Sequence, residues 1–218
     1  MATARSPIES TVRTPSTGSP SGALILIHGR GADAGDLEPL LNILDPESRL
    51  LGVFPRGPLV LPPGGRHWYI VREVGFPDPG TFLPTYSELT EHLGGVLAEH
   101  GLDWDRALVG GFSQGAVMSY ALGLGEAKPR PAAILAFSGF VPTVDGFELD
   151  LGSRAGLPVS IAHGSLDPVI GVEFARKART LLGEAGLAVD YREDPVGHTI
   201  SPGGLAQAIT VLSSALDY

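Results

Sequence analysis

One serine stands in a sequence context typical of a nucleophile. The stretch Gly111-Phe112-Ser113-Gln114-Gly115 follows an apolar run and leads into a segment with helical composition. A G-x-S-x-G motif between a strand and a helix forms a sharp turn that pushes the serine hydroxyl out above the sheet. Glycine is needed on both sides of the turn, because a Cβ there would collide with a neighbouring strand or helix. The alternative is a buried turn whose serine only caps the following helix.

A nucleophilic serine needs a base and an acid that orients the base, because a free hydroxyl stays protonated at neutral pH. Where G-x-S-x-G forms such a turn, the order along the chain is Ser, then Asp or Glu, then His. Asp167 follows a candidate strand that reads as buried, and His198 follows the next candidate strand along the chain. The carboxyl ends of strands are where open parallel sheets place their sites. The sequence therefore predicts Ser113, Asp167 and His198 as nucleophile, acid and base.

Other residues compete for two of these roles. Asp167 precedes Pro168, so it could instead be an ordinary helix N-cap. His163 lies at the end of a strand pattern, where a packed side chain is more typical than a base. Three further acidic residues lie nearby, one inside a strand pattern and two very close to His198 in the sequence: Asp190, Glu193 and Asp194.

A glycine-rich loop offers candidate hydrogen-bond donors. The apolar strand pattern at Ala23–Ile27 runs directly into His28-Gly29-Arg30-Gly31. Acyl transfer builds negative charge on a carbonyl oxygen, and N–H groups already aimed at that oxygen lower the barrier. The backbone N–H groups of Arg30 and of Gln114, the residue after the serine, are the predicted donors. A plain strand-to-helix turn is the alternative reading of this loop.

The elements that must position these residues alternate along the chain. Strands are expected at 23–27, 50–54, 107–111, 132–137, 159–163 and 188–192, with an edge strand near 10–13. Helices are expected at 34–44, 86–100, 114–124, 168–185 and 203–214. Strands that are apolar at every position are typical of parallel sheets covered on both faces. This predicts a single α/β domain at 22–218, a doubly wound and mostly parallel sheet with no large cap domain, after an irregular lead-in at 1–21.

The segment at 55–84 is long and rich in proline and glycine, and we expect it to be irregular. Loops of this length in a compact domain are usually functional or disordered. Trp68 and Phe76 in this segment, and Phe140 and Val141 beyond a later strand, are predicted to line a substrate pocket. Trp68 could equally anchor the loop to the core.

Composition narrows the classes of function. The chain has 218 residues, 43% of them hydrophobic, and no cysteine, which excludes disulfides, cysteine-ligated zinc and a thiol nucleophile. A net charge of −9 argues against nucleic acid or an anionic membrane as the main partner. No apolar run is long enough to span a bilayer, and the lead-in lacks the apolar core of a signal peptide. We expect a cytoplasmic protein that needs no cofactor or metal and binds a small molecule. The sequence leaves open whether the protein forms a homodimer.

Five motifs together resemble the phospholipase/carboxylesterase family of α/β-hydrolases, which includes acyl-protein thioesterases and small bacterial carboxylesterases. They run in order from about Ala23 to the C-terminus: Ile27-His28-Gly29-Arg30-Gly31-Ala32-Asp33, Phe54-Pro55-Arg56-Gly57-Pro58, Gly111-Phe112-Ser113-Gln114-Gly115, Phe137-Ser138-Gly139 and His163-Gly164-Ser165-Leu166-Asp167-Pro168-Val169. The resemblance implies a Ser113/His198/Asp167 triad, an oxyanion hole from Arg30 and Gln114, and hydrolysis of esters or thioesters.

Two departures from the family pattern concern the substrate more than the chemistry. Ala116 stands where a further glycine is common, and residues 64–84, which face the substrate in relatives, match poorly. We expect a serine carboxylesterase acting on short-to-medium acyl esters through an acyl-enzyme. An acyl-protein thioesterase or lysophospholipase acting on longer chains is the alternative. A non-catalytic ligand-binding protein with this fold is a more distant one.

Overall fold

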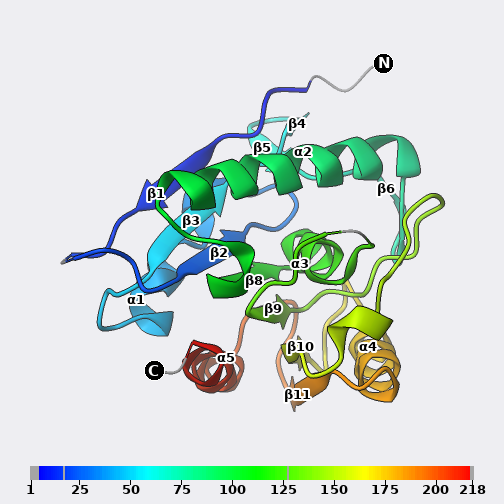
Figure 1. Cartoon of the computed structure of the whole chain (residues 1–218). Helices are drawn as coiled ribbons and strands as arrows, with labels where there is room; N and C mark the ends of the chain where they lie inside the picture. Colours follow the sequence, from blue (N-terminus) through cyan, green and yellow to red (C-terminus); the bar gives the residue numbers. More distant parts are fainter. Residues whose placement is uncertain (1–4, 17, 127, 217–218) are drawn as a thin grey trace.

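A computed structural model describes residues 5–16, 18–126 and 128–216, with a seven-stranded sheet at its centre (Figure 1). Across the sheet the strands are β1 (Ser10–Arg13), β3 (Leu51–Pro55), β2 (Ala23–Ile27), β8 (Ala107–Phe112), β9 (Ala133–Phe137), β10 (Pro158–Gly164) and β11 (Ala188–Asp194). Only β1 in this sheet is antiparallel to its neighbour. The predicted mostly parallel sheet is confirmed, and each strand ends within two residues of its expected bounds.

Helices cover both faces of the sheet (Figure 1). On one face lie α2 (Pro79–Glu99), α3 (Gln114–Leu124) and α4 (Val172–Glu184), and on the other lie α1 (Leu41–Leu44) and α5 (Pro202–Ala215). Side chains of β2 alternate between the two cores. Ile25 and Ile27 pack on the face of α2 and α3, whereas Leu24 and Leu26 pack on the face of α5. Burial on both faces explains why this strand is apolar at every position.

Two of the expected helices differ clearly in the structure. The single helix expected at 34–44 is wrong: the segment forms 3-10 turns at Ala34–Asp36 and Glu38–Leu40 and then α1. Pro39 has no N–H to donate, so a continuous helix cannot pass through it without losing a bond. In contrast, α2 begins at Pro79, well before the expected residue 86, and includes Pro84. Burial of Phe82 on this turn offsets the hydrogen bond that Pro84 cannot make.

The segment at 55–84 is more regular than the sequence suggests. It contains one hairpin of β4 (Leu59–Leu61) with β5 (Gly65–His67) and a second of β6 (Val71–Glu73) with β7 (Phe76–Pro77). The second hairpin turns at Gly75, whose φ of 95° suits glycine best. Further 3-10 turns lie at Trp104–Arg106 and Gly152–Arg154. The two hairpins bring the segment back over the carboxyl ends of the central strands.

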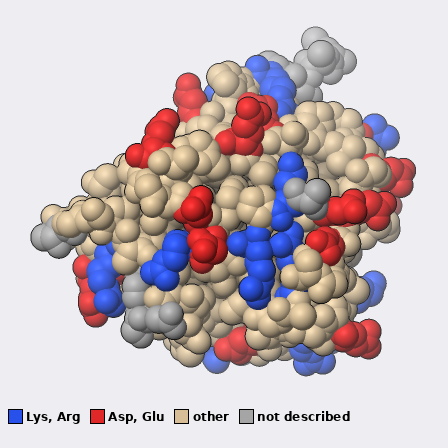
Figure 2. All heavy atoms as spheres, viewed as in Figure 1, with Lys and Arg blue, Asp and Glu red and all other residues tan. Residues whose placement is uncertain are grey.

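The surface carries charges of both signs. On the face that Figure 2 shows, acidic and basic side chains are interspersed rather than gathered into one broad area. Several basic side chains are paired with carboxylates, as in the Arg176–Glu193 and Arg192–Asp194 ion pairs of 2.6 and 2.7 Å. Within the part of the chain that the structure describes, each helix is too short or too polar to cross a lipid bilayer.

Candidate functional site

Ser113 occupies the turn between β8 and α3 with φ of 55° and ψ of −118°, a conformation that L residues rarely adopt. Its N–H donates to the carbonyl of Phe137 at 2.9 Å, which holds the turn against β9. A Cβ on Gly115 would lie 1.9 Å from the carbonyl oxygen of Ile27, so only glycine fits there. The Ser113 side chain makes no capping hydrogen bond to α3, which argues against the helix-cap alternative.

The three side chains predicted as nucleophile, base and acid lie in one chain of contacts. Ser113 Oγ is 2.9 Å from His198 Nε2, and His198 Nδ1 is 2.6 Å from Asp167 Oδ2. Asp167 follows β10 and His198 follows β11, so the parallel order of the strands brings them to the same edge of the sheet as Ser113. The structure thus brings together all three residues that the sequence singled out.

The Asp167 carboxylate is fixed through both of its oxygens. While Oδ2 faces His198, Oδ1 accepts the N–H groups of Val169 and Ile170 at 2.8 and 2.9 Å. Burial alone would raise the pKa of Asp167, but the hydrogen bonds from His198 and from these two N–H groups outweigh it and lower the pKa below its ordinary value. A negative charge therefore stays beside the imidazole at neutral pH. The helix N-cap alternative is wrong, because α4 begins at Val172 with Gly171 as its N-cap.

The competing residues are engaged elsewhere. His163 is buried in β10, and its Nε2–H donates to the carbonyl of Ile170 at 2.8 Å. Its Nε2 lies 3.4 Å from Asp167 Oδ2, whereas His198 Nδ1 lies 2.6 Å from the same oxygen. Glu193 and Asp194 form ion pairs with arginines of α4 and β11. In the part of the chain that the structure describes, none of these three side chains makes a hydrogen bond to Ser113.

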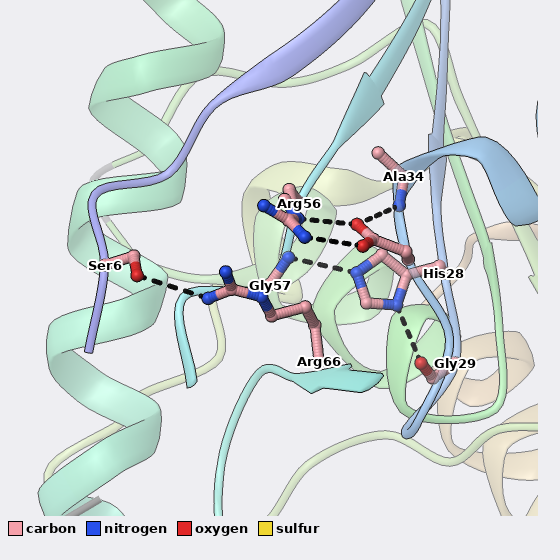
Figure 3. A network of polar contacts seen from close by, with 8 residues as sticks. Ser6, His28, Gly29, Ala34, Arg56, Gly57 and Arg66 are labelled. Atoms are coloured by element: carbon pink, nitrogen blue, oxygen red, sulfur yellow. Dashed lines mark hydrogen bonds and ion pairs between the residues drawn. The ribbon is translucent and has the colours of Figure 1, made fainter. Parts of the chain in front are cut away.

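The glycine-rich loop after β2 is held by a buried imidazole (Figure 3). His28 Nε2 accepts the N–H of Gly57 at 3.0 Å, so the ring proton must lie on Nδ1, which donates to the carbonyl of Gly29 at 2.7 Å. Farther along the loop, Arg56 binds both oxygens of Asp33 at 2.7 Å. These contacts attach the loop to the first residues of the 55–84 segment.

Acid pH should destabilise the fold through His28. Burial lowers the pKa of His28 below 6.5, the value at which the imidazole of an unfolded chain takes up a proton. Below that pH the unfolded state binds more protons than the folded state, so stability falls as the pH falls. We expect His28→Gln to lose less Tm than wild type between about pH 7.5 and 5.5. An equal loss of Tm in both proteins would contradict this prediction. It would assign the pH dependence to other histidines, such as His67 and His92, whose pKa burial also lowers.

The two residues predicted to supply N–H donors are tied to the same segment. Gln114 Oε1 accepts the N–H of Trp68, and Gln114 Nε2 donates to the carbonyl of Tyr69, both at 2.8 Å. The indole N–H of Trp68 donates to the carbonyl of His28 at 2.9 Å, beside Arg30. In the described residues, the backbone N–H groups of Arg30 and Gln114 have no protein acceptor. Both are therefore available to a bound group.

A pocket of about 440 Å³ opens in front of Ser113. Its polar wall is formed by Arg30, Glu73, Ser113, Gln114 and His198, and its apolar wall by Tyr69, Val71, Val74, Phe140, Val169 and Ile170. Of the four residues predicted to bind substrate, Phe140 belongs to this wall. Trp68 is fully buried behind it, Phe76 is exposed outside it, and Val141 packs against the core. The binding roles of these residues stay predictions.

Sequence reasoning missed most of the apolar wall. Val169 and Ile170 follow Asp167 directly, and two apolar residues next to a candidate acid in a loop were the available signal. Val71 and Val74 lie on the second hairpin, which the sequence did not predict. A hydroxyl, an imidazole, an ionised carboxylate and two free N–H groups beside an apolar pocket are the groups that acyl transfer requires.

The chain is similar to known esterases and thioesterases over nearly its full length. The Phospholipase/Carboxylesterase family model matches residues 10–216. Acyl-protein thioesterase 1 of Debaryomyces hansenii is 28% identical, over 94% of this chain and 96% of its own length. A carboxylesterase structure from Bacillus cereus superimposes with a TM-score of 0.82 at 25% identity, covering 95% of this chain and 94% of that one. Esterase PE8 gives a TM-score of 0.81 at 25% identity, covering 96% and 99%. The chain therefore belongs to the Phospholipase/Carboxylesterase family of α/β-hydrolases.

Proposed function

We propose that the protein is a serine carboxylesterase that hydrolyses short-to-medium acyl esters through an acyl-enzyme. The observation that carries this proposal is the continuous contact from Ser113 Oγ through His198 to the Asp167 carboxylate, with distances of 2.9 and 2.6 Å. A binding protein would gain nothing from a serine held in a strained turn and aligned with a base and an acid.

The reaction follows from this arrangement. Ser113 Oγ attacks the ester carbonyl carbon as its proton moves to His198 Nε2, and Asp167 stabilises the imidazolium. The carbonyl oxygen becomes an oxyanion that accepts the N–H groups of Arg30 and Gln114. The bond to the leaving alcohol then breaks, and His198 donates its proton to the alcohol oxygen. Water attacks the resulting Ser113 ester with His198 again as the base, and the carboxylic acid is released.

The side chain of Gln114 should matter for catalysis although it never touches the substrate in this scheme. Gln114→Ala keeps the backbone N–H but removes the two hydrogen bonds that fix it to Trp68 and Tyr69. We expect kcat to fall about 10- to 100-fold with little change in KM, since small displacements of a catalytic donor are costly. The measurement is steady-state hydrolysis of p-nitrophenyl butyrate well below the Tm of the variant.

Gln207→Ala is the matched control for this prediction. Gln207 Nε2 also makes several hydrogen bonds, to Ser160 Oγ and to the carbonyl of Asp190, but it lies on α5 away from the pocket. We expect its kcat to stay near that of wild type. An equal loss of kcat in the two variants would mean that Gln114 acts through stability alone.

The size of the pocket sets the expected preference for acyl length. A volume of about 440 Å³ is near the small end for ligand pockets. Each buried methylene adds about 0.8 kcal/mol, or about fourfold in kcat/KM, until the pocket is full. Across p-nitrophenyl esters from acetate to palmitate, we expect kcat/KM to rise up to about four to eight carbons and then level off. A value still rising at palmitate would show an open groove and favour long-chain substrates.

A thioesterase is the second candidate. The relative from Debaryomyces hansenii is named an acyl-protein thioesterase, and it matches this chain over nearly the full length of both. The same acyl-enzyme would form, with a thiol leaving instead of an alcohol. A thiol has a pKa of about 8.5 and needs less help from His198 to depart. A matched pair of octanoyl substrates, one an alkyl ester and one an alkyl thioester, separates the two functions by their kcat/KM values.

A further inference from the structure

A second hollow lies on the other side of His198. It has a volume of about 260 Å³, and its apolar walls are Leu37, Pro39, Leu40, Phe112 and Ile200. His198 lines both this groove and the larger pocket in front of Ser113. The groove therefore borders the proposed site at its base, and the mechanism above gives it no role.

The walls of the groove come from three segments that the site already uses. Residues 36–40 follow the glycine-rich loop, Phe112 directly precedes Ser113, and Ile200 follows His198 by two residues. The ring of Phe112 tilts against the imidazole of His198, with 4.7 Å between the ring centroids. Leu40, Phe112 and Ile200 are partly buried against the core, so their positions are set by packing and their outer surfaces stay open. An apolar group resting on them would be removed from water.

The chemistry of the proposed function determines which part of a substrate lies there. In the tetrahedral intermediate one carbon bears Ser113 Oγ, the oxyanion, the acyl chain and the leaving group. His198 Nε2 takes its proton from Ser113 Oγ and must hand it to the leaving atom, so the leaving group departs on the side of His198. The oxyanion points to Arg30 and Gln114, which leaves the larger apolar pocket for the acyl chain.

We propose, on the basis of the proposed function, that the groove beyond His198 binds the leaving group, and that the substrates are esters of apolar, uncharged alcohols. Asp36 is the charged side chain at the groove, and no lysine or arginine lines it within the described residues. An alcohol that carries a carboxylate or phosphate would meet the negative charge of Asp36, with no lysine or arginine among the described residues of the groove to offset it. The enzyme thus discriminates on both sides of the scissile bond, with separate subsites for acyl chain and alcohol.

Two ester series test this assignment. One holds the acyl group as butyrate and varies the alcohol from methyl through butyl to hexyl; the other holds ethanol and varies the acid from acetate to hexanoate. Each is measured as kcat/KM, which includes every step up to release of the alcohol. In wild type we expect kcat/KM to rise at least about tenfold from methyl to hexyl butyrate. A butyrate of 6-hydroxyhexanoate, which adds a carboxylate to the alcohol, should react at least about tenfold more slowly than hexyl butyrate.

Matched variants assign the two series to the two cavities. Leu40→Ala, in the groove, should flatten the alcohol series and leave the rise along the acyl series unchanged. Phe140→Ala, in the larger pocket, should do the reverse. Leu40→Met keeps an apolar side chain of similar size, so it should restore the rise of kcat/KM along the alcohol series. This variant distinguishes a loss of binding surface from a loss of stability.

The possible failures are distinguishable. A flat alcohol series in wild type, or one variant flattening both series, would overturn the groove assignment while leaving the esterase intact. No hydrolysis of any ester, together with no labelling of Ser113 by a fluorophosphonate, would instead remove the proposed function on which the assignment rests.

Discussion

Replacement of Ser113 by alanine should reduce ester hydrolysis by at least about 10³-fold while the protein stays folded. In the structure the Ser113 hydroxyl contacts His198 Nε2 and makes no capping bond to α3, so its removal takes away the nucleophile and little packing. Residual activity would come from the N–H donors and from substrate binding. The measurement is kcat/KM for p-nitrophenyl butyrate, with circular dichroism and Tm as checks on the fold.

Ser138→Ala is the matched control for this change. Ser138 also has a positive φ, of 51°, and its Oγ is buried with no hydrogen-bond partner in the described structure. We expect this variant to keep most of the activity, and a fluorophosphonate to label Ser113 in it as in wild type. If Ser113→Ala keeps more than a few per cent of the activity, or if the label is found on Ser138, the nucleophile has been assigned to the wrong serine.

The meeting of Ser113, Asp167 and His198 at one edge of the sheet could be predicted because each position depends on local pattern and on order along the chain. The strands before Ser113 and Asp167 are buried on both faces, so their sequences are mostly apolar and easily recognised. A parallel sheet then brings the residues that follow such strands to one edge. The turn at Ser113 was equally readable, since a Cβ on either flanking glycine would collide with the backbone around it.

The pocket could not be read in the same way. Trp68 was predicted as a pocket wall because it is aromatic and lies in an irregular segment, but it is fully buried and donates its indole N–H to the carbonyl of His28. Val71 and Val74 reach the pocket only because a hairpin folds that segment back over the strand ends. Such placement depends on contacts between segments distant in sequence, which local composition does not encode. The early start of α2 was missed for a related reason, since burial of Phe82 outweighs the local effect of Pro84.

Replacement of Asp167 by asparagine should reduce kcat by about 10⁴-fold, the loss seen when such a change leaves the base in the wrong tautomer. The structure gives the reason. Oδ1 of Asp167 accepts the N–H groups of Val169 and Ile170, so the oxygen of the new amide must stay on that side. Its NH₂ group then faces His198 Nδ1 and donates to it. The ring proton is therefore forced onto Nε2 and points at Ser113 Oγ. With this proton in place, Nε2 cannot accept the proton of the nucleophile.

The loss of kcat in Asp167→Asn should act entirely through His198, so it should not add to the loss caused by removing His198. We expect His198→Ala to be at least as damaging, and the double variant Asp167→Asn/His198→Ala to be little worse than His198→Ala, because an acid that acts by orienting a ring has no role once the ring is gone. The carboxamide still accepts both N–H groups through its oxygen, so Tm should change little in Asp167→Asn. Two results would contradict the assignment. Additive losses in the double variant would give Asp167 a function apart from His198. Full activity in His198→Ala together with an inactive His163→Ala would transfer the role of base to His163, whose Nε2 also lies within 3.4 Å of Asp167 Oδ2.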